Sequence, residues 1–174
     1  MKSNKNIVKQ LCFTGVFAAL VCAATFIAVP LPFGYFNLGD CIILLGAWCL
    51  GPIYGALAAG IGSGLADLFM GYAIYAPGTF FIKAGIAFIA AFLFAAMAKR
   101  ISKDFISRLI SAVAGEFWMV LGYFIYESVL LGYGMGATAS FFGNMMQGIC
   151  GTLAAVLLIG AMRKTGSIKN TFGL

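Results

Sequence analysis

The chain has 174 residues, of which 63% are hydrophobic and 9% are charged, and its mean hydropathy is +1.03. A soluble domain of this length carries far more polar surface, so the composition excludes a soluble globular protein and favours a bilayer as the solvent. The formal net charge of +6 does not indicate nucleic-acid binding, because the basic residues follow the membrane topology described below.

In a bilayer every backbone polar group must be satisfied within the protein, which leaves helices or a closed barrel. Barrel strands read as short segments of alternating hydrophobicity, whereas the apolar runs here are long and rich in Ala, Leu, Ile and Gly. The sequence therefore predicts an all-α integral membrane protein, with residues 1–174 forming one domain. The first apolar run is too long for the core of a typical signal peptide, so we expect a retained helix.

Six apolar segments follow one another along the chain. Five of them are long enough to span a bilayer, which takes roughly 20 apolar residues. The segment that covers residues 38–50 is shorter, and it is separated from the next one by Gly51 and Pro52, a pair that ends one helix and begins another. In chain order the predicted spans are about 7–29, 38–50, 52–71, 79–98, 106–131 and 137–162.

Six spans would place both termini on the same side of the membrane. Ten of the eleven basic residues fall on that side, and the loops at 30–37, 72–78 and 132–136 contain no Lys or Arg. The positive-inside rule makes that side cytoplasmic, so we predict an N-in/C-in orientation. The ten residues are Lys2, Lys5, Lys9, Lys99, Arg100, Lys103, Arg108, Arg163, Lys164 and Lys169.

Lys83 is the exception, because it lies inside a predicted span about one turn from the outer end. Its side chain could snorkel to the outer interface. Asp67 lies at a similar predicted depth on the preceding helix, so an ion pair between Asp67 and Lys83 would lower the cost of burying both charges. Such a pair could serve helix packing alone, or it could also bind a ligand; the sequence leaves both interpretations open.

Two further spans carry polar stripes. Glu116, Tyr123 and Glu127 share one helical face, and Ser140, Asn144 and Gln147 share a face on the last helix. Interhelical hydrogen bonding explains one such residue well, but it explains two carboxylates and two amides poorly. The two stripes therefore favour a hydrated cavity.

The outer loops add aromatic and polar groups to this half of the molecule. One loop supplies Tyr35, Phe36, Asn37 and Asp40, and the next supplies Tyr75. Aromatic side chains at this depth can form an interfacial belt. Because they are mixed here with Gly, Pro, Asn and Asp, we expect instead a lid that covers a flat ligand.

Small residues recur at four-residue spacing on the first helix, at Gly15, Ala19 and Ala23. Such a stripe lets two helices approach closely, either within the bundle or between this chain and a partner protein.

No metal site and no histidine-dependent catalytic set can be assembled. An intramembrane enzyme could still use Glu116 or Glu127 with Lys83, but nothing in the sequence specifies a reaction. The chain has no histidine, and its five cysteines form no CxxC pair, so we expect free thiols and no metal. No Walker ATP-binding motif occurs, and no cofactor is predicted.

Three stretches together resemble a known family: "YFNLGD", "LGPIYGALAAGIGSGLADL" and "YAPGTFFIKAGIAFIAAFL". They look like the substrate-binding S components of energy-coupling factor (ECF) vitamin transporters, and most closely like the group for riboflavin, hydroxymethylpyrimidine or pyridoxine-type substrates. The resemblance covers residues 35–93 in motif and the rest of the chain in helix number and topology. Ala19 and Ala23 also match the family's AxxxA motif, which contacts the transmembrane coupling protein.

The resemblance implies a multi-pass protein of the bacterial plasma membrane that is not an enzyme. It would capture a vitamin at the outer face and pair with a coupling protein and two ATPases, surrounded by membrane lipid and without nucleic acid. The alternative is a stand-alone secondary transporter or channel for a small organic solute. The predicted substrate-binding residues are Tyr35, Phe36, Asn37, Asp40, Asp67, Tyr75, Lys83, Tyr123, Glu127, Asn144 and Gln147.

The charges predict what kind of ligand binds. If Asp67 neutralises Lys83, the remaining carboxylates make the site negative, and a low-dielectric site magnifies this field. A flat neutral or weakly cationic heterocycle should then bind better than an anion. Pyridoxine-like and hydroxymethylpyrimidine-like molecules fit this description, with riboflavin as the larger neutral candidate.

Overall fold

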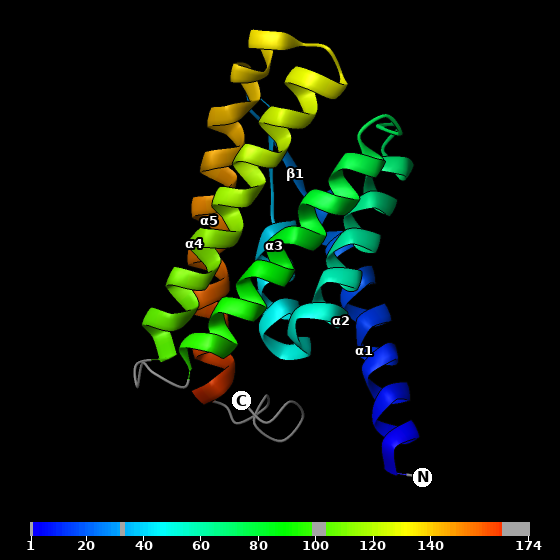
Figure 1. Cartoon of the computed structure of the whole chain (residues 1–174), viewed down its shortest axis with the longest axis vertical. Coiled ribbons are helices and arrows are strands. Elements are labelled where there is room, and N and C mark those ends of the chain that lie inside the picture. The colour runs from blue at the N-terminus through cyan, green and yellow to red at the C-terminus, as the bar shows by residue number, and fades with distance from the viewer. Residues whose placement is uncertain (1, 32–33, 99–103, 165–174) are drawn as a thin grey trace.

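The computed structural model describes residues 2–31, 34–98 and 104–164. Within these ranges the chain forms five long helices and a two-stranded hairpin (Figure 1). The elements are α1 (Lys2–Phe26), β1 (Ala28–Leu31), β2 (Gly34–Asn37), α2 (Gly39–Phe69), α3 (Ala76–Met97), α4 (Asp104–Ile125), a π-helical turn η1 (Tyr126–Leu130), a 3₁₀ turn η2 (Gly134–Ala137) and α5 (Thr138–Lys164).

The segment between α1 and α2 is a β-hairpin where the sequence predicted only a loop. The two strands run antiparallel, with Ala28 opposite Asn37 and Leu31 opposite Gly34. Pro30 is tolerated in β1 because each strand of a two-stranded sheet has one unpaired edge. The hairpin delivers the chain directly to Asn37 and the start of α2.

Helix α2 is interrupted at Gly51, whose φ of 80° and ψ of −179° lie outside the helical region and suit a residue without a Cβ. The chain reverses there, since a Cβ on Gly55 would lie 2.9 Å from the Cα of Ala47. The predicted spans 38–50 and 52–71 thus correspond to the two helical halves of α2 (39–50 and 52–69), which Gly51 separates. The described chain has five helices that are long and apolar enough to span a membrane, where the sequence predicted six.

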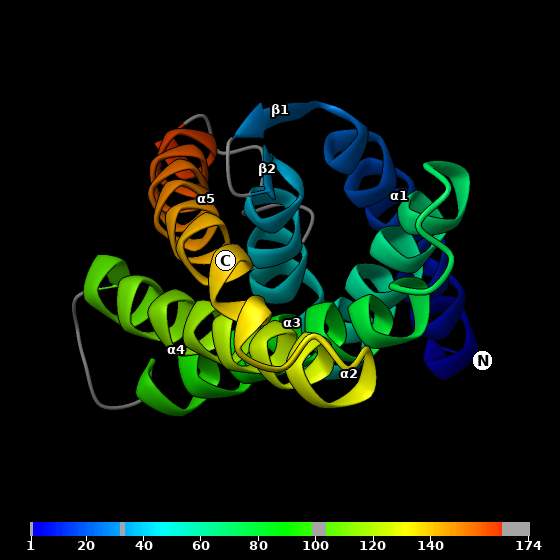
Figure 2. The ribbon, with the colours of Figure 1, turned by 90° about the horizontal axis from the view of Figure 1, so that it is seen from above.

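The first half of α2 occupies the middle of the molecule. Seen from above, it lies beneath the hairpin with the other helices around it (Figure 2). Leu44 and Ala47 are completely buried, and Trp48 is nearly so. A helix that is apolar on all sides belongs in a core, which explains why this short segment has no polar face.

The helices leave their apolar side chains exposed on the outside. Phe69, Phe81 and Leu157 are each at least 70% exposed, and many other large apolar side chains are exposed as well. In water this surface would be unfavourable, whereas lipid tails solvate it. Together with the five spanning helices, it makes the chain a multi-pass helical membrane protein.

The two ends of the bundle differ. The start of α1 and the end of α5 lie together at one end, here called the terminal end (Figure 1). The β-hairpin and the turns between α2 and α3 and between α4 and α5 lie toward the other, here called the hairpin end.

Candidate functional site

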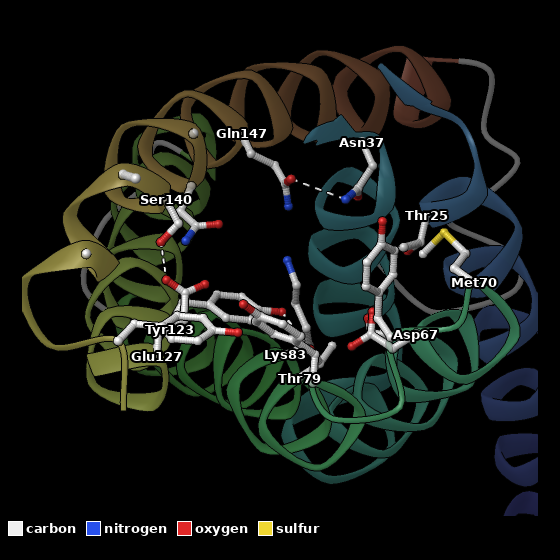
Figure 3. A pocket seen from close by; sticks show the side chains of 18 residues that line it. Thr25, Asn37, Asp67, Met70, Thr79, Lys83, Tyr123, Glu127, Ser140 and Gln147 are labelled. Atoms are coloured by element: carbon white, nitrogen blue, oxygen red, sulfur yellow. Dashed lines mark hydrogen bonds between the residues drawn. The ribbon is translucent and has the colours of Figure 1, made fainter. Parts of the chain in front are cut away.

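A cavity of about 500 Å³ opens toward the hairpin end (Figure 3). Its walls come from α1, α2, α3, α4, η1, η2, α5 and the end of β2. Its lining residues are Thr25, Asn37, Ser63, Asp67, Met70, Tyr72, Tyr75, Thr79, Lys83, Tyr123, Glu127, Tyr133, Gly136, Ala139, Ser140, Gly143, Asn144 and Gln147.

Most of the predicted site residues meet at this cavity. Eight of them line it: Asn37, Asp67, Tyr75, Lys83, Tyr123, Glu127, Asn144 and Gln147. Asp40 is fully buried directly behind the lining. The side chains of Tyr35 and Phe36 lie outside the described part of the chain, so their predicted contact with a ligand stays a prediction.

The predicted Asp67–Lys83 ion pair is wrong. Lys83 Nζ instead lies 2.5 Å from Asp40 Oδ1, and both side chains are buried. The packing of the first half of α2 beside α3 is the reason, because it brings Asp40 within reach of Lys83. Helix order along the chain could not reveal that Asp40, and not Asp67, would reach Lys83.

Asp67 consequently has no paired cation within the described chain. Its Oδ2 atom is buried with no hydrogen-bond partner among the described residues, although the side chain lines the cavity. A buried, unpaired carboxylate oxygen is costly, so Asp67 is available to accept hydrogen bonds from a molecule in the cavity.

One wall of the cavity is a continuous set of hydrogen bonds. The backbone N–H of Gly39 donates to Asn37 Oδ1 (2.9 Å), and Asn37 Nδ2 donates to Gln147 Oε1 (3.2 Å). Gln147 Nε2 then donates to Asp40 Oδ2 (2.5 Å). These bonds join the hairpin, α2 and α5 on the side of the cavity that Lys83 faces.

Glu127 and Ser140 lie on the opposite side, where Ser140 Oγ donates to Glu127 Oε2. Between the two sides, Tyr123 donates to Thr79 Oγ1 (3.0 Å), and Lys83 Nζ lies 5.7 Å from the centre of the Tyr123 ring. The π-helical turn η1 carries Glu127, and such turns are frequent at functional sites.

Tyrosines form the rim of the cavity. Tyr72, Tyr75 and Tyr133 all line it. Burial, and secondly the nearby Glu127 carboxylate, raises the pKa of the Tyr75 phenol above its ordinary value. Tyr75 therefore stays neutral and presents both a hydroxyl and a flat ring at neutral pH.

Glu116 is buried deeper than the cavity lining. Its side chain is 5% exposed, and neither carboxylate oxygen has a hydrogen-bond partner among the described residues. It packs against Gly148, where a Cβ would lie 3.0 Å from the Cβ of Glu116. The predicted helical stripe is therefore split, with Tyr123 and Glu127 at the cavity and Glu116 beneath it.

Sequence reasoning did not select several lining residues, among them Thr25, Ser63, Met70, Thr79 and Tyr133. Thr79 lies one helical turn before Lys83, so its spacing could have identified it. The others are single residues in helices or turns and carry no signal without the fold.

The small-residue stripe of α1 faces outward. Gly15, Ala19 and Ala23 are exposed, and a Cβ on Gly15 would meet no described atom within 4 Å. The opposite face of α1 is the packed one, since a Cβ on Gly62 of α2 would lie 2.4 Å from the backbone oxygen of Ala18.

Comparison with known proteins gives concordant results. The profile of the family described as "ECF-type riboflavin transporter, S component" matches residues 5–164. An uncharacterized protein of Pyrococcus woesei, encoded in a gap 3' region, is 35% identical over 127 residues, which cover 73% of this chain and 81% of that protein.

A solved structure of the S component of a bacterial ECF transporter has the same fold. It superposes with a TM-score of 0.72 at 21% sequence identity and covers 90% of this chain and 96% of that chain. The fold, the cavity at the hairpin end and the profile match over nearly the whole sequence lead to one conclusion: this chain belongs to the family of S components of ECF-type riboflavin transporters.

Proposed function

We propose that this chain is the substrate-binding subunit of an ECF importer and that it captures riboflavin in the cavity at the hairpin end. It holds the vitamin without catalysing a reaction. The observation that carries this proposal is the cavity itself, which combines a volume of about 500 Å³ with tyrosines at the rim and a hydrogen-bonding wall.

The size of the cavity favours a ligand larger than one ring. Sites for drug-sized ligands typically enclose about 300–1,000 Å³. Pyridoxine or hydroxymethylpyrimidine would leave much of this cavity unfilled. The three-ring system of riboflavin with its ribityl chain fills it better, and the family description names the same vitamin.

The charges of the cavity favour a neutral ligand. Asp40 neutralises Lys83 at 2.5 Å, while Asp67 and Glu127 line the cavity without a lysine or arginine partner in the described chain. A like charge brought into this field is disfavoured, and a partly desolvated site increases the effect. Flavin mononucleotide, folate and pyridoxal phosphate should therefore bind poorly.

We infer that the terminal end faces the cytoplasm of a bacterial plasma membrane and the cavity faces outward. The basic residues at the start of α1, between α3 and α4 together with the start of α4, and at and after the end of α5 support this orientation through the positive-inside rule. In this arrangement the two halves of α2 cross as separate segments, which makes six crossings with both termini inside. A site that opens at the outer end suits capture of a solute from outside.

The exposed stripe on α1 is proposed to contact the transmembrane coupling protein. Gly15, Ala19 and Ala23 leave a flat helical face on which another helix can pack closely. Ala19→Trp or Ala23→Trp should abolish uptake that depends on the ATPases while riboflavin binding by the isolated subunit survives. Normal uptake by both variants would exclude this face as the contact.

A binding panel on the purified protein tests the substrate. Quenching of flavin fluorescence measures riboflavin and flavin mononucleotide, and calorimetry measures pyridoxine, hydroxymethylpyrimidine, folate and pyridoxal phosphate. We expect riboflavin to bind most tightly and the three anions to bind weakly. Preferred binding of any anion would overturn the charge argument, and preferred binding of a single-ring vitamin would overturn the choice of riboflavin.

A separate experiment tests the transport mechanism. Riboflavin uptake is measured in cells that express this chain with and without the coupling protein and two ATPases. Uptake only with the complete module supports the proposal. Equal uptake by the chain alone would favour the stand-alone transporter instead.

A further inference from the structure

The hydrogen bonds of the cavity wall run in one direction. They begin at the backbone N–H of Gly39, pass through the side-chain amides of Asn37 and Gln147, and end at the carboxylate of Asp40. Each amide accepts one bond through its oxygen and donates the next through its nitrogen.

The donor at one end of this series of hydrogen bonds and the acceptor at the other end fix its direction. A backbone N–H can only donate, so Asn37 must turn its oxygen toward Gly39. The Asp40 carboxylate forms an ion pair with Lys83 and accepts hydrogen bonds, so Gln147 must turn its nitrogen toward Asp40. Rotating either amide by half a turn would place two donors or two acceptors against each other.

This direction decides which groups face the cavity. Asn37 Nδ2 and Gln147 Nε2 each use one hydrogen in the chain and keep a second. Lys83 donates to Asp40 and to Met119 Sδ (3.0 Å), which leaves its third N–H. Figure 3 shows the nitrogen atoms of Lys83 and Gln147 directed toward the middle of the cavity.

The other side of the cavity has the opposite character. Asp67 and Glu127 line it with carboxylate oxygens, one of which, Asp67 Oδ2, has no partner among the described residues. The cavity therefore has a donor wall, formed by Asn37 and Gln147 and completed by the ammonium of Lys83 that reaches toward it, and an acceptor side, where Asp67 and Glu127 flank Lys83 (Figure 3).

We propose that Asp40, which does not line the cavity, is the positioning residue that sets this polarity, so that the donor wall recognises a ligand edge with neighbouring hydrogen-bond acceptors. The assignment rests on the proposed function. In riboflavin such an edge pairs a carbonyl of the pyrimidinedione ring with the adjacent acceptor nitrogen (C2=O with N1, or C4=O with N5), and the ribityl hydroxyls then face Asp67 and Glu127.

Exchanging the carboxylate and the amide between positions 40 and 147 tests the proposal. In the double variant Asp40→Asn/Gln147→Glu, the new amide at position 40 can still accept from Lys83. It can also donate to the new carboxylate at position 147, which accepts from Asn37 as well. Every hydrogen bond of the cavity wall is kept, and so is the net charge. Position 147 now presents an acceptor to the cavity in place of a donor.

The stabilities of the single and double variants without ligand test the direction of the hydrogen bonds in the cavity wall. Asp40→Asn alone places two donors against each other at some point in the series of hydrogen bonds, and it removes the counter-charge of Lys83. Gln147→Glu alone sets two carboxylates side by side. We expect each single variant to lower the thermal midpoint by several degrees and the double variant to regain most of the loss.

Flavin binding by the double variant tests the donor wall. We expect its affinity for riboflavin to fall at least about tenfold, the equivalent of one lost hydrogen bond to a buried group. Lumiflavin, which keeps the ring carbonyls but lacks the ribityl hydroxyls, should lose affinity by a similar factor. Glu127→Gln, the matched control on the acceptor side, should weaken riboflavin but not lumiflavin.

The outcomes separate the two claims. If the double variant is no more stable than the less stable single variant, the proposed direction of the hydrogen bonds is wrong. A stable double variant that binds riboflavin normally overturns the donor wall, and unchanged lumiflavin binding overturns the choice of ligand edge. Wild-type protein that binds no flavin overturns the proposed function and the flavin edge, while the ligand-free stabilities still decide the role of Asp40.

Discussion

Two buried cations lie in different parts of this membrane protein and have different surroundings. Lys83, at the hairpin end, is paired with Asp40 and still lines a cavity. Arg108, at the terminal end of α4, is 1% exposed and is enclosed by packing. Its guanidinium lies 4.2 Å from the centre of the Phe94 ring and 5.1 Å from that of Trp48.

The surroundings of Arg108 close that end of the bundle. Asp104 accepts from Arg108 Nε (2.8 Å) and also from Arg163, which joins α4 to α5. Trp48, beside the reversal of α2, donates to Ser111 Oγ (3.2 Å). None of these residues lines the cavity.

The difference teaches what a buried charge can do in a bilayer. The planar guanidinium of Arg108 stacks on aromatic rings and serves packing. The compact ammonium of Lys83 keeps a donor for the cavity after its counter-ion is satisfied. Changes at Arg108 should therefore affect stability alone, whereas changes at Lys83 should affect stability and binding.

The largest expected effect follows from Lys83→Met. This change leaves Asp40 fully buried without its cation, which should cost about 3–5 kcal/mol of unfolding free energy, measured by thermal and denaturant unfolding in detergent. Riboflavin affinity should fall as well.

The double variant Lys83→Met/Asp40→Asn separates the two effects of Lys83. It has no buried charge at this pair and should recover part of the stability without recovering riboflavin binding. Full recovery of binding would show that Lys83 has only a structural role, like Arg108.

Arg108→Met should have the next largest effect on stability. It removes two stacking contacts in a desolvated site, each worth up to about 2 kcal/mol. The dissociation constant of riboflavin, measured on the folded protein, should stay within about twofold because the site is independent. Arg108→Lys, which keeps the charge but not the planar group, should recover only part of the stability. A large loss of affinity in either variant would contradict the separation of the two regions.

Asn37→Ala compares single hydrogen bonds in the two regions. Removing this amide breaks the cavity wall and should weaken riboflavin binding by about 1–3 kcal/mol, measured by fluorescence quenching. Ser111→Ala removes the acceptor of the Trp48 indole in the Arg108 region and serves as the matched control. It should lower the thermal midpoint without changing affinity; equal affinities for wild type and Asn37→Ala would remove Asn37 from the site.

The smallest effect concerns alkaline stability at the rim of the cavity. Because burial and Glu127 raise the pKa of Tyr75, the folded protein keeps this phenolic proton more tightly than the unfolded chain does. The stabilisation is present below the unfolded pKa of about 10 and is lost as pH rises above it. Thermal midpoints of wild type should thus fall more steeply than those of Tyr75→Phe between about pH 9 and pH 11. Parallel curves would contradict the raised pKa of Tyr75.

The sequence by itself determined the class of protein and the end of the bundle that carries the site. Long continuous apolar runs form helices in lipid, and helical periodicity places polar residues such as Tyr123 and Glu127 on one face. That is why eight predicted residues line the cavity.

Only the tertiary structure decided which of these groups meet. The two predicted spans on either side of Gly51 implied a reversal of the chain there, but not that Asp40, in place of Asp67, would then pair with Lys83. The orientation of the Gln147 amide was equally hidden, since it depends on a carboxylate more than a hundred residues away. Periodicity fixes the face of one helix, whereas pairing across helices depends on how the chain folds back, and a buried ion pair forms only where that path brings opposite charges into contact.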